Sequence, residues 1–227
     1  MARTLNLATH AVRREAFVDA ALGLMQAKGY EQMSIQDVLD AVEASRGAFY
    51  HYFESKQALL GAMIDRIADQ ALGALAPVVD DPKLAAIPKL EAFFSGIARY
   101  KTERKALMLE FIKVWKSDHN AVVRERLAPA MVQKVAPILA RIIKQGNAEE
   151  AFSVESPQET ARILMTLMLG FQDIATDLFL ARQAGKISYS EAERTLLSFT
   201  RAFERILGAP RGSIQVVDET TLREWFG

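Results

Sequence analysis

Residues 45–56 carry side chains suited to binding an anionic, hydrogen-bonding partner. The segment reads Ser-Arg-Gly-Ala-Phe-Tyr-His-Tyr-Phe-Glu-Ser-Lys. Arg46 can donate paired hydrogen bonds to a guanine edge, whereas Tyr50, His51 and Lys56 suit phosphate oxygens, as does the hydroxyl of Ser34. A glycine inside a helix costs up to about 1 kcal/mol relative to alanine, so Gly47 makes sense where the backbone approaches a partner closely. The chemistry indicated is nucleic-acid recognition.

Two short helices must position these side chains. A helix over 34–41 and a second over 45–51 each begin at a serine, a residue that caps helices well. About three residues join them, which is helix-turn-helix spacing. Phe49 and Phe53 lie four residues apart and should face inward, against the apolar side of a preceding helix over 9–28.

Residues 13–60 resemble the DNA-binding region of the tetracycline-repressor (TetR) family. The matching stretches are Ala20-Ala21, Gly29-Tyr30, Ser34-Ile35, Val38, 45–53 and 56–60. The resemblance implies a domain that contacts double-stranded DNA. The residues expected to contact DNA are Ser34, Gln36, Ser45, Arg46, Gly47, Tyr50, His51, Tyr52 and Lys56.

The predicted turn departs from the family pattern. The family usually has glycine where this chain has Glu43, and a larger valine where it has Ala44. A non-glycine residue in the left-handed conformation costs on the order of 1 kcal/mol. We therefore expect a turn of another shape, which would tilt the second helix.

The charge of this region predicts a modest dependence of DNA binding on salt. Residues 1–60 hold six Lys or Arg and seven Asp or Glu, a net charge of −1. Residues 1–14, however, carry three arginines and no acid, and such a segment can lie along phosphates or in the minor groove.

Capping residues and apolar periodicity predict an all-α chain of nine helices. Their expected ranges are 9–28, 34–41, 45–51, 55–76, 83–101, 104–117, 120–145, 157–183 and 190–207. Expected capping boxes are Ser34 with Asp37, Ser156 with Glu159, and Ser190 with Glu193, and the expected C-terminal caps are Gly29, Gly146, Gly185 and Gly208. We expect a helix-turn-helix domain over 1–54, a helical effector-binding and dimerisation domain over 55–208 with 55–76 as connector, and a tail over 209–227. The tail is expected to be loosely held, although its Trp225 and Phe226 would suit docking on the body, since both are costly to leave exposed.

Apolar stripes mark the larger domain. For any single residue of a stripe, core packing is the more common role, and lining a cavity is the alternative. The resemblance implies an effector cavity, for which the candidates are Phe93, Phe111, Trp115, Met131 and Phe171. It also implies that the last two helices form a four-helix bundle with a second copy, so that a homodimer binds a palindromic operator.

Several other functions are disfavoured. The chain of 227 residues has no cysteine, which excludes disulfides, thiolate zinc sites and a cysteine nucleophile, and its formal net charge of zero excludes a general polycation. The three histidines, His10, His51 and His119, are scattered, and no common catalytic or phosphate-binding motif occurs. We expect no enzyme, metal or cofactor, no membrane-spanning segment, and a cytoplasmic protein. The alternatives are a helical small-molecule binding protein with little or no DNA binding, favoured by Glu43 and the negative charge, and an all-α enzyme.

Overall fold

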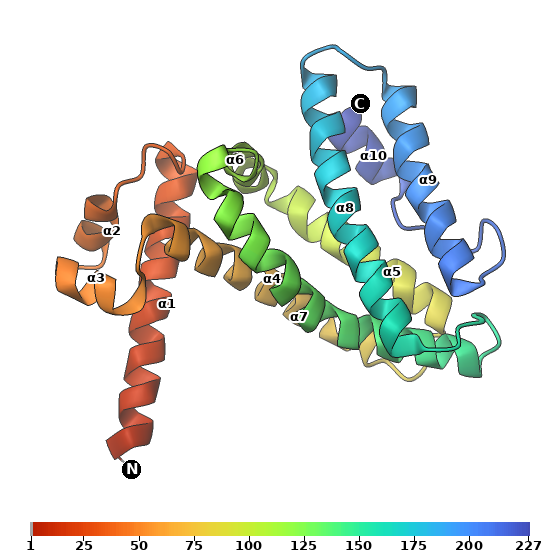
Figure 1. Ribbon diagram of the computed structural model, residues 1–227, viewed down its shortest axis with the longest axis horizontal. Coiled ribbons are helices and arrows are strands. Elements are labelled where there is room, and N and C mark those ends of the chain that lie inside the picture. Colours follow the sequence, from red (N-terminus) through yellow and green to blue (C-terminus); the bar gives the residue numbers. More distant parts are fainter. Residues whose placement is uncertain (1) are drawn as a thin grey trace. The chain divides into compact units, whose positions relative to one another are not determined.

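The computed structural model describes residues 2–227, and the side chains of residues 10–227. This part of the chain forms ten α-helices, one short 3-10 helix and no strand, which confirms the all-α class (Figure 1). The expected count of nine was wrong because an additional helix forms near the C-terminus. The chain divides into two compact units, one of Met1–Gln70 with Arg104–Leu127 and one of Ala71–Glu103 with Ala128–Gly227.

The N-terminal unit contains the helix-turn-helix. Its elements are α1 (Ala2–Lys28), α2 (Ile35–Ala41), α3 (Arg46–Tyr52), the first part of α4 (Lys56–Val79), α6 (Lys105–Trp115), the 3-10 helix η1 (Asp118–Asn120) and the start of α7 (Ala121–Ala148). The predicted domain boundary at residue 54 does not coincide with this division, because α6 packs against α1.

Aromatic and aliphatic side chains form the core of this unit. Phe17 of α1 is fully buried, and its ring centroid lies 5.8 Å from that of Phe49 and 6.2 Å from that of Phe53. The predicted inward orientation of the two later phenylalanines is therefore confirmed. Leu59 of α4 and Leu107 of α6 complete the same core.

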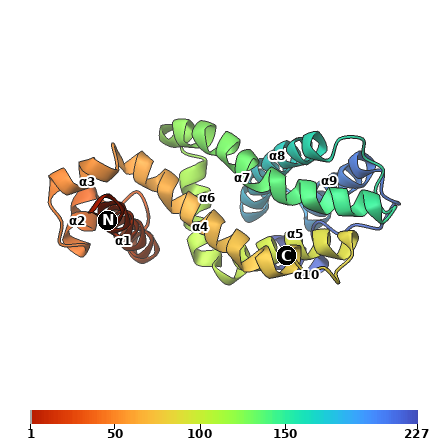
Figure 2. The same cartoon turned by 90° about the horizontal axis from the view of Figure 1, so that it is seen from below.

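The second unit contains the ends of α4 and α7 together with four whole helices. These are α5 (Ala86–Glu103), α8 (Pro157–Gln183), α9 (Tyr189–Leu207) and α10 (Glu219–Phe226). Helices α8 and α9 lie side by side, as Figure 2 shows from a second direction. Buried residues of α5, α7, α8 and α9, among them Phe93, Leu139, Leu164 and Phe203, form its core.

The expectation of a loosely held tail was wrong. Helix α10 packs against α5, α8 and α9. The indole nitrogen of Trp225 donates a hydrogen bond to Thr102 Oγ1 (2.8 Å), and the ring centroid of Trp225 lies 5.9 Å from that of Phe179. Ile214 and Val216 join the core ahead of this helix. The tail is held because its apolar side chains are buried against helices distant in the sequence.

Some predicted helix ends are confirmed and others were wrong. The Ser34–Asp37 capping box forms, but α9 is capped by Ser188 with Glu191 rather than by the predicted pair two residues later. Ser156 precedes α8 as expected but its side chain makes no capping hydrogen bond. Of the expected C-terminal caps, Gly29, Gly185 and Gly208 have positive φ.

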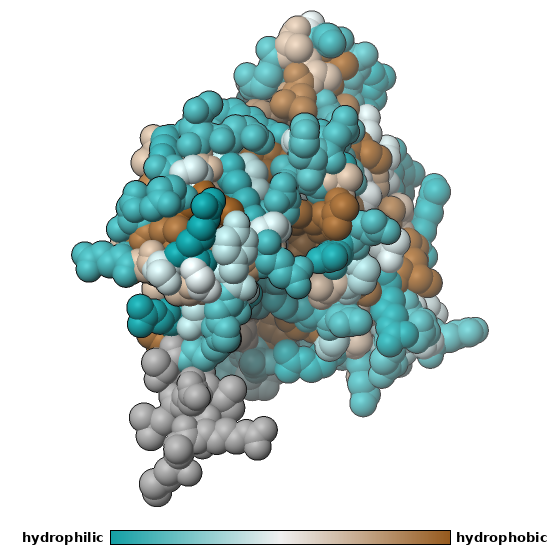
Figure 3. Space-filling model, turned by 60° about the vertical axis from the view of Figure 1, so that its left-hand side comes forward, coloured by the Kyte–Doolittle hydropathy of each residue, from teal (hydrophilic) through white to brown (hydrophobic). Residues whose placement is uncertain are grey.

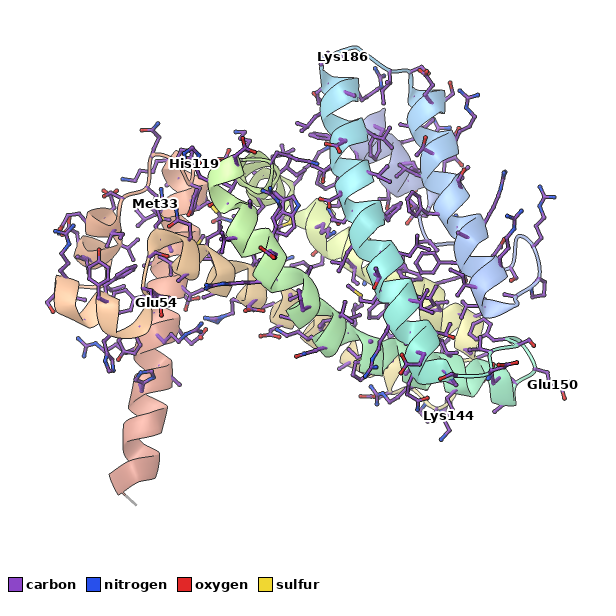
Figure 4. The ribbon with its side chains drawn as sticks, in the orientation of Figure 1. Met33, Glu54, His119, Lys144, Glu150 and Lys186 are labelled. Atoms are coloured by element: carbon purple, nitrogen blue, oxygen red, sulfur yellow. The ribbon has the colours of Figure 1, made fainter. Side chains whose placement is uncertain are left out.

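The remaining predicted cap, Gly146, lies inside α7 instead. A Cβ at this position would lie 2.0 Å from the ring of Phe152, so its glycine makes room for a buried aromatic side chain. The left-handed residue after α7 is Glu150 (φ 58°), labelled in Figure 4. Helix α4 also runs through Pro77 to Val79, past its predicted end at 76, and α5 begins at Ala86 rather than at 83.

Candidate nucleic-acid interface and effector site

Helix α3 presents a polar face to solvent. The Ser45 hydroxyl accepts a hydrogen bond from the Ala48 backbone N–H (3.2 Å) and so caps the helix. The residues that follow on the outer side, Arg46, Gly47, Tyr50 and His51, are exposed, whereas Phe49 is buried. The face of the molecule drawn in Figure 3 is mainly hydrophilic, with hydrophobic residues in separate patches. The predicted outward side chains are thus free to meet a ligand together.

The expectation of an altered turn was wrong. Glu43 adopts a left-handed backbone (φ 50°), the conformation that glycine supplies more cheaply. The Ala44 N–H donates to the Leu39 carbonyl (3.0 Å) and closes the turn behind α2. The ordinary helix-turn-helix geometry is therefore kept, at a cost of about 1 kcal/mol in backbone strain.

Ser34 caps α2 and Gln36 lies in its first turn, and both side chains already have partners. The Ser34 hydroxyl donates to Asp37 Oδ2 (2.7 Å), and Gln36 Nε2 donates to Asp40 Oδ1 (2.8 Å). Asp37 also forms an ion pair with Lys28 Nζ (2.6 Å), and hydrogen bonds from Lys28 and Ser34 hold the pKa of this carboxyl well below its usual range. Both side chains are exposed, but a phosphate bound there would compete with these hydrogen bonds.

Lys56, in the first turn of α4, is held in place before any ligand arrives. Its Nζ lies 4.2 Å from the centre of the Tyr30 ring and donates to the Glu31 carbonyl (3.4 Å). Burial lowers the pKa of the Lys56 ammonium from its ordinary value. The half-buried aliphatic stem and the contact with the Tyr30 ring restrict the conformations of the Lys56 side chain. Less conformational entropy is therefore lost when its ammonium contacts a phosphate.

The structure adds a residue that the sequence gave no reason to place here. The His10 ring on α1 lies 4.5 Å from the ring of Tyr52 and 5.3 Å from that of His51, measured between centroids. No motif or spacing connects a residue of α1 with α3, so only the fold reveals the contact. His10 thus supports the exposed end of α3.

Of the basic N-terminal residues, Arg13 is exposed and Arg14 has partners. Arg14 forms an ion pair with Glu15 (3.1 Å), and its guanidinium carbon lies 5.2 Å from the centre of the Phe53 ring. The third arginine of the predicted basic segment, Arg3, lies outside the residues whose side chains are described.

The five candidate effector residues are divided between the two units. Phe111 and Trp115 pack against the core of the N-terminal unit. Phe93 is fully buried in the core of the second unit, and Met131 packs against that core. The Phe171 ring lies 5.1 Å from that of Phe199 on α9. Within the second unit, therefore, α5, α7 and α8 each contribute one candidate.

Helix α8 also carries exposed apolar side chains. Ile163, Ile174 and Leu180 are 56%, 39% and 40% exposed. By length and composition alone this helix would be apolar enough to cross a membrane, which the sequence analysis did not expect. Only two charged residues, Asp173 and Asp177, lie between Ile163 and Leu180. The three apolar side chains remain exposed in a single copy of the chain, whereas Leu164, Met165 and Phe179 of the same run are buried.

An exposed, serine-capped second helix behind a tight turn is the arrangement of a helix-turn-helix, the motif that many DNA-binding proteins place in the major groove. Residues 17–63 match the family model described as "Bacterial regulatory proteins, tetR family", and residues 106–188 match "Tetracyclin repressor-like, C-terminal domain". Together the two matches cover more than half of the chain. This chain belongs to the TetR family of transcriptional regulators.

Individual relatives agree with this assignment. The chain is 25% identical over 181 residues to the HTH-type transcriptional repressor DhaR of Mycobacterium sp. strain GP1, covering 80% of this chain and 83% of that protein. A transcriptional regulator from Cytophaga hutchinsonii has a similar structure, with a TM-score of 0.60 and 17% sequence identity. The match covers 86% of this chain and 96% of that regulator. The structure of SmeT, the repressor of the Stenotrophomonas maltophilia multidrug efflux pump SmeDEF, is similar with a TM-score of 0.56 and 17% sequence identity. The match covers 90% of this chain and 96% of SmeT. These two structures support the fold alone.

Proposed function

We propose that this chain is a ligand-responsive, cytoplasmic transcriptional repressor that binds a palindromic operator as a homodimer. A small apolar or aromatic effector releases it from DNA. The observation that carries the proposal is the exposed polar face of α3, held on a buried aromatic core and a turn of ordinary shape. The repressor relative DhaR, similar over most of both chains, supports the direction of regulation.

In this proposal the side chains of α3 have separate roles. Arg46 reads a guanine edge, because its guanidinium can donate two parallel hydrogen bonds there. Tyr50 and His51 bind phosphates beside it, and Lys56 binds a phosphate from the start of α4. Gly47 lets the backbone approach the groove. The remaining candidates, Ser34, Gln36, Ser45 and Tyr52, are assigned to the edge of the same surface.

The exposed apolar side chains of α8 support the proposed dimer. Ile163 and Leu180 are each about half exposed, so a partner that covered the remainder would gain roughly 1 kcal/mol for each side chain. The adjacent helix α9 offers a second face for the same contact. A two-fold dimer presents two copies of α3, which must enter successive turns of the major groove. Its operator is therefore expected to have half-sites about 34–36 Å apart.

Fluorescence anisotropy with DNA from immediately upstream of the gene tests the proposal, with scrambled DNA as competitor. We expect binding that survives the competitor and that Arg46→Ala removes. The control is Arg211→Ala, because Arg211 is an exposed arginine of the second unit. A duplex selected from a random pool replaces the upstream DNA if that promoter is not the target. If no duplex binds better than scrambled DNA, the small-molecule binding protein becomes the better account.

A further inference from the structure

Two histidines that lie far apart in the sequence meet at the exposed end of α3. The His10 ring of α1 and the His51 ring of α3 are 5.3 Å apart between centroids and stand nearly edge to face, at 74°. Tyr52 contacts both rings, with centroid distances of 4.5 Å to His10 and 5.1 Å to His51. Both histidine side chains are exposed. The aromatic contacts thus hold two imidazoles side by side in water, next to the polar face of α3.

The charged groups that α1 contributes near this pair are basic or already paired. The turn after His10 carries Arg13 and Arg14. Glu15, the carboxylate that follows, forms ion pairs with Arg14 (3.1 Å) and with Arg66 of α4 (2.9 Å). The charge of this carboxylate is therefore balanced by arginines of the chain.

The groups on the other elements next to α3 keep a fixed charge near neutral pH. Helix α2, which packs against α3, carries Asp37, paired with Lys28, and Asp40, which accepts a hydrogen bond from Gln36. Helix α3 and the segments on either side of it carry further titratable side chains, namely Glu43, Arg46, Tyr50, Tyr52, Glu54 and Lys56. Carboxylates, phenols, lysines and arginines ordinarily titrate outside the range from about pH 5.5 to 7.5. A change of charge at this surface within that range therefore comes from the two imidazoles.

Protonation makes an imidazole a better partner for phosphate. Histidine is the side chain whose charge ordinarily changes near neutral pH. A neutral ring has one N–H donor, and protonation adds a second donor and a positive charge. A phosphate of the DNA backbone only accepts hydrogen bonds, and bonds from a charged donor are roughly twice as strong as neutral ones. Since such bonds are about 2.7–2.9 Å long, two rings 5.3 Å apart can reach the oxygens of one phosphate.

We propose that His10 and His51 together bind one phosphate of the operator backbone and take up protons from solvent as they do so. The site adds α1 to the elements that contact DNA, beside the phosphate contacts of His51 on α3 and Lys56 on α4. It also makes the affinity for DNA rise as the pH falls. The proposal deepens the proposed function and rests on it, because the phosphate belongs to the duplex that α3 reads.

The pH dependence of DNA affinity tests the proposal. We would measure the Kd of the full chain for a duplex selected from a random pool, by fluorescence anisotropy at constant ionic strength between about pH 5.5 and 7.5. Uptake of one proton changes an affinity by up to about tenfold per pH unit, so the Kd should fall at least about tenfold from the upper to the lower pH. A Kd that is constant or that rises with acidity would overturn the proposal.

Substitutions of single histidines locate the effect. His10→Gln should bind within about twofold of the wild type at pH 7.5 and lose much of the gain at pH 5.5, whereas a merely structural role of His10 would weaken binding equally at every pH. His10→Lys supplies a permanent charge, so it should bind more tightly than the wild type at pH 7.5 and depend less on pH.

The matched control is the third histidine of the chain. His119 is exposed in η1 and is labelled in Figure 4. Because the chain has three histidines and no cysteine, His119→Gln tests the one remaining imidazole, and it should keep the full pH dependence. A pH profile that His10→Gln leaves unchanged would contradict the assignment.

Scrambled DNA separates this inference from the proposed function. If the selected duplex is preferred and the pH dependence is lost in His10→Gln, both stand. If scrambled DNA binds as well as the selected duplex and the pH dependence still requires His10, the phosphate contact stands and the proposed function fails. If the selected duplex is preferred but His10→Gln keeps the pH dependence, the inference alone fails. No binding of any duplex contradicts both.

Discussion

The two units of this protein hold their polar functional side chains in opposite ways. In the N-terminal unit the side chains of α3 face water and are positioned by local contacts, such as the bond between Ser45 and the Ala48 N–H. In the second unit Lys89 is buried and is positioned by Gln145, 56 residues later. The exposed face of a helix can be predicted from helical periodicity, whereas the role of a buried charged side chain can be inferred only when its partners are known.

The largest expected effect comes from a substitution that disrupts the core of the N-terminal unit and leaves the core of the second unit intact. Phe49→Ala removes a fully buried ring that contacts Phe17 and Phe53, and should cost about 3–5 kcal/mol of stability. Because the second unit has its own core, we expect DNA binding to be lost while the second unit stays folded. Urea unfolding combined with a DNA titration measures this. Full DNA affinity in Phe49→Ala would mean that α3 does not depend on this core.

The lowered pKa of Lys101 makes the stability of the fold depend on pH. The folded pKa of Lys101 lies below its value in the unfolded chain, so the unfolded state binds more protons between about pH 8 and 10.5. This lysine's contribution to stability should therefore rise with pH across that interval. Unfolding curves of the wild type minus those of Lys101→Met isolate it, and a difference that falls with pH would be the wrong sign.

Docking of the C-terminal helix should have a smaller effect. Trp225→Phe keeps an aromatic ring against Phe179 and deletes the hydrogen bond to Thr102. We expect a loss of about 0.5–1.5 kcal/mol, the usual net contribution of one such bond. Thr102→Val removes the other partner, and the double variant should cost less than the sum of the two. Strict additivity in this cycle would show that the bond contributes nothing.

The smallest effect compares one strained turn in each unit. Glu43 and Glu150 both have left-handed backbones (φ 50° and 58°). Glu43→Gly should stabilise the N-terminal unit by up to about 1 kcal/mol and leave the sequence preference for DNA unchanged. Glu150→Gly is the matched change in the second unit. Urea unfolding measures both, and a changed DNA preference in Glu43→Gly would mean that glutamate itself sets the angle of α3.

The sequence predicted the parts of this fold that short-range physics determines. Capping serines and apolar spacing located α2 and α3 to within a residue or two. The shape of the turn at Glu43 was mispredicted because propensity alone ignores the hydrogen bond from Ala44 to Leu39 that closes it.

Long-range contacts explain what the sequence did not predict. The indole of Trp225 suits docking by its residue type alone, but its partner Thr102 lies 123 residues away in the sequence. The apolar stripes did not indicate that Phe111 packs against the core of the N-terminal unit, whereas Phe93 lies in the core of the second unit. Lys101 and Lys89 also look alike in the sequence of α5, and only the structure shows that Lys89 is buried whereas Lys101 is partly exposed.

Selection of duplexes from a random pool tests the central claim most directly, because it needs no knowledge of the target promoter. The account predicts enrichment of a palindrome whose half-sites are about one helical turn, 10 base pairs, apart or a multiple of that spacing, and loss of this enrichment in Arg46→Ala. A pool that stays unenriched with folded wild-type protein would contradict the assignment of α3 as a DNA-reading helix.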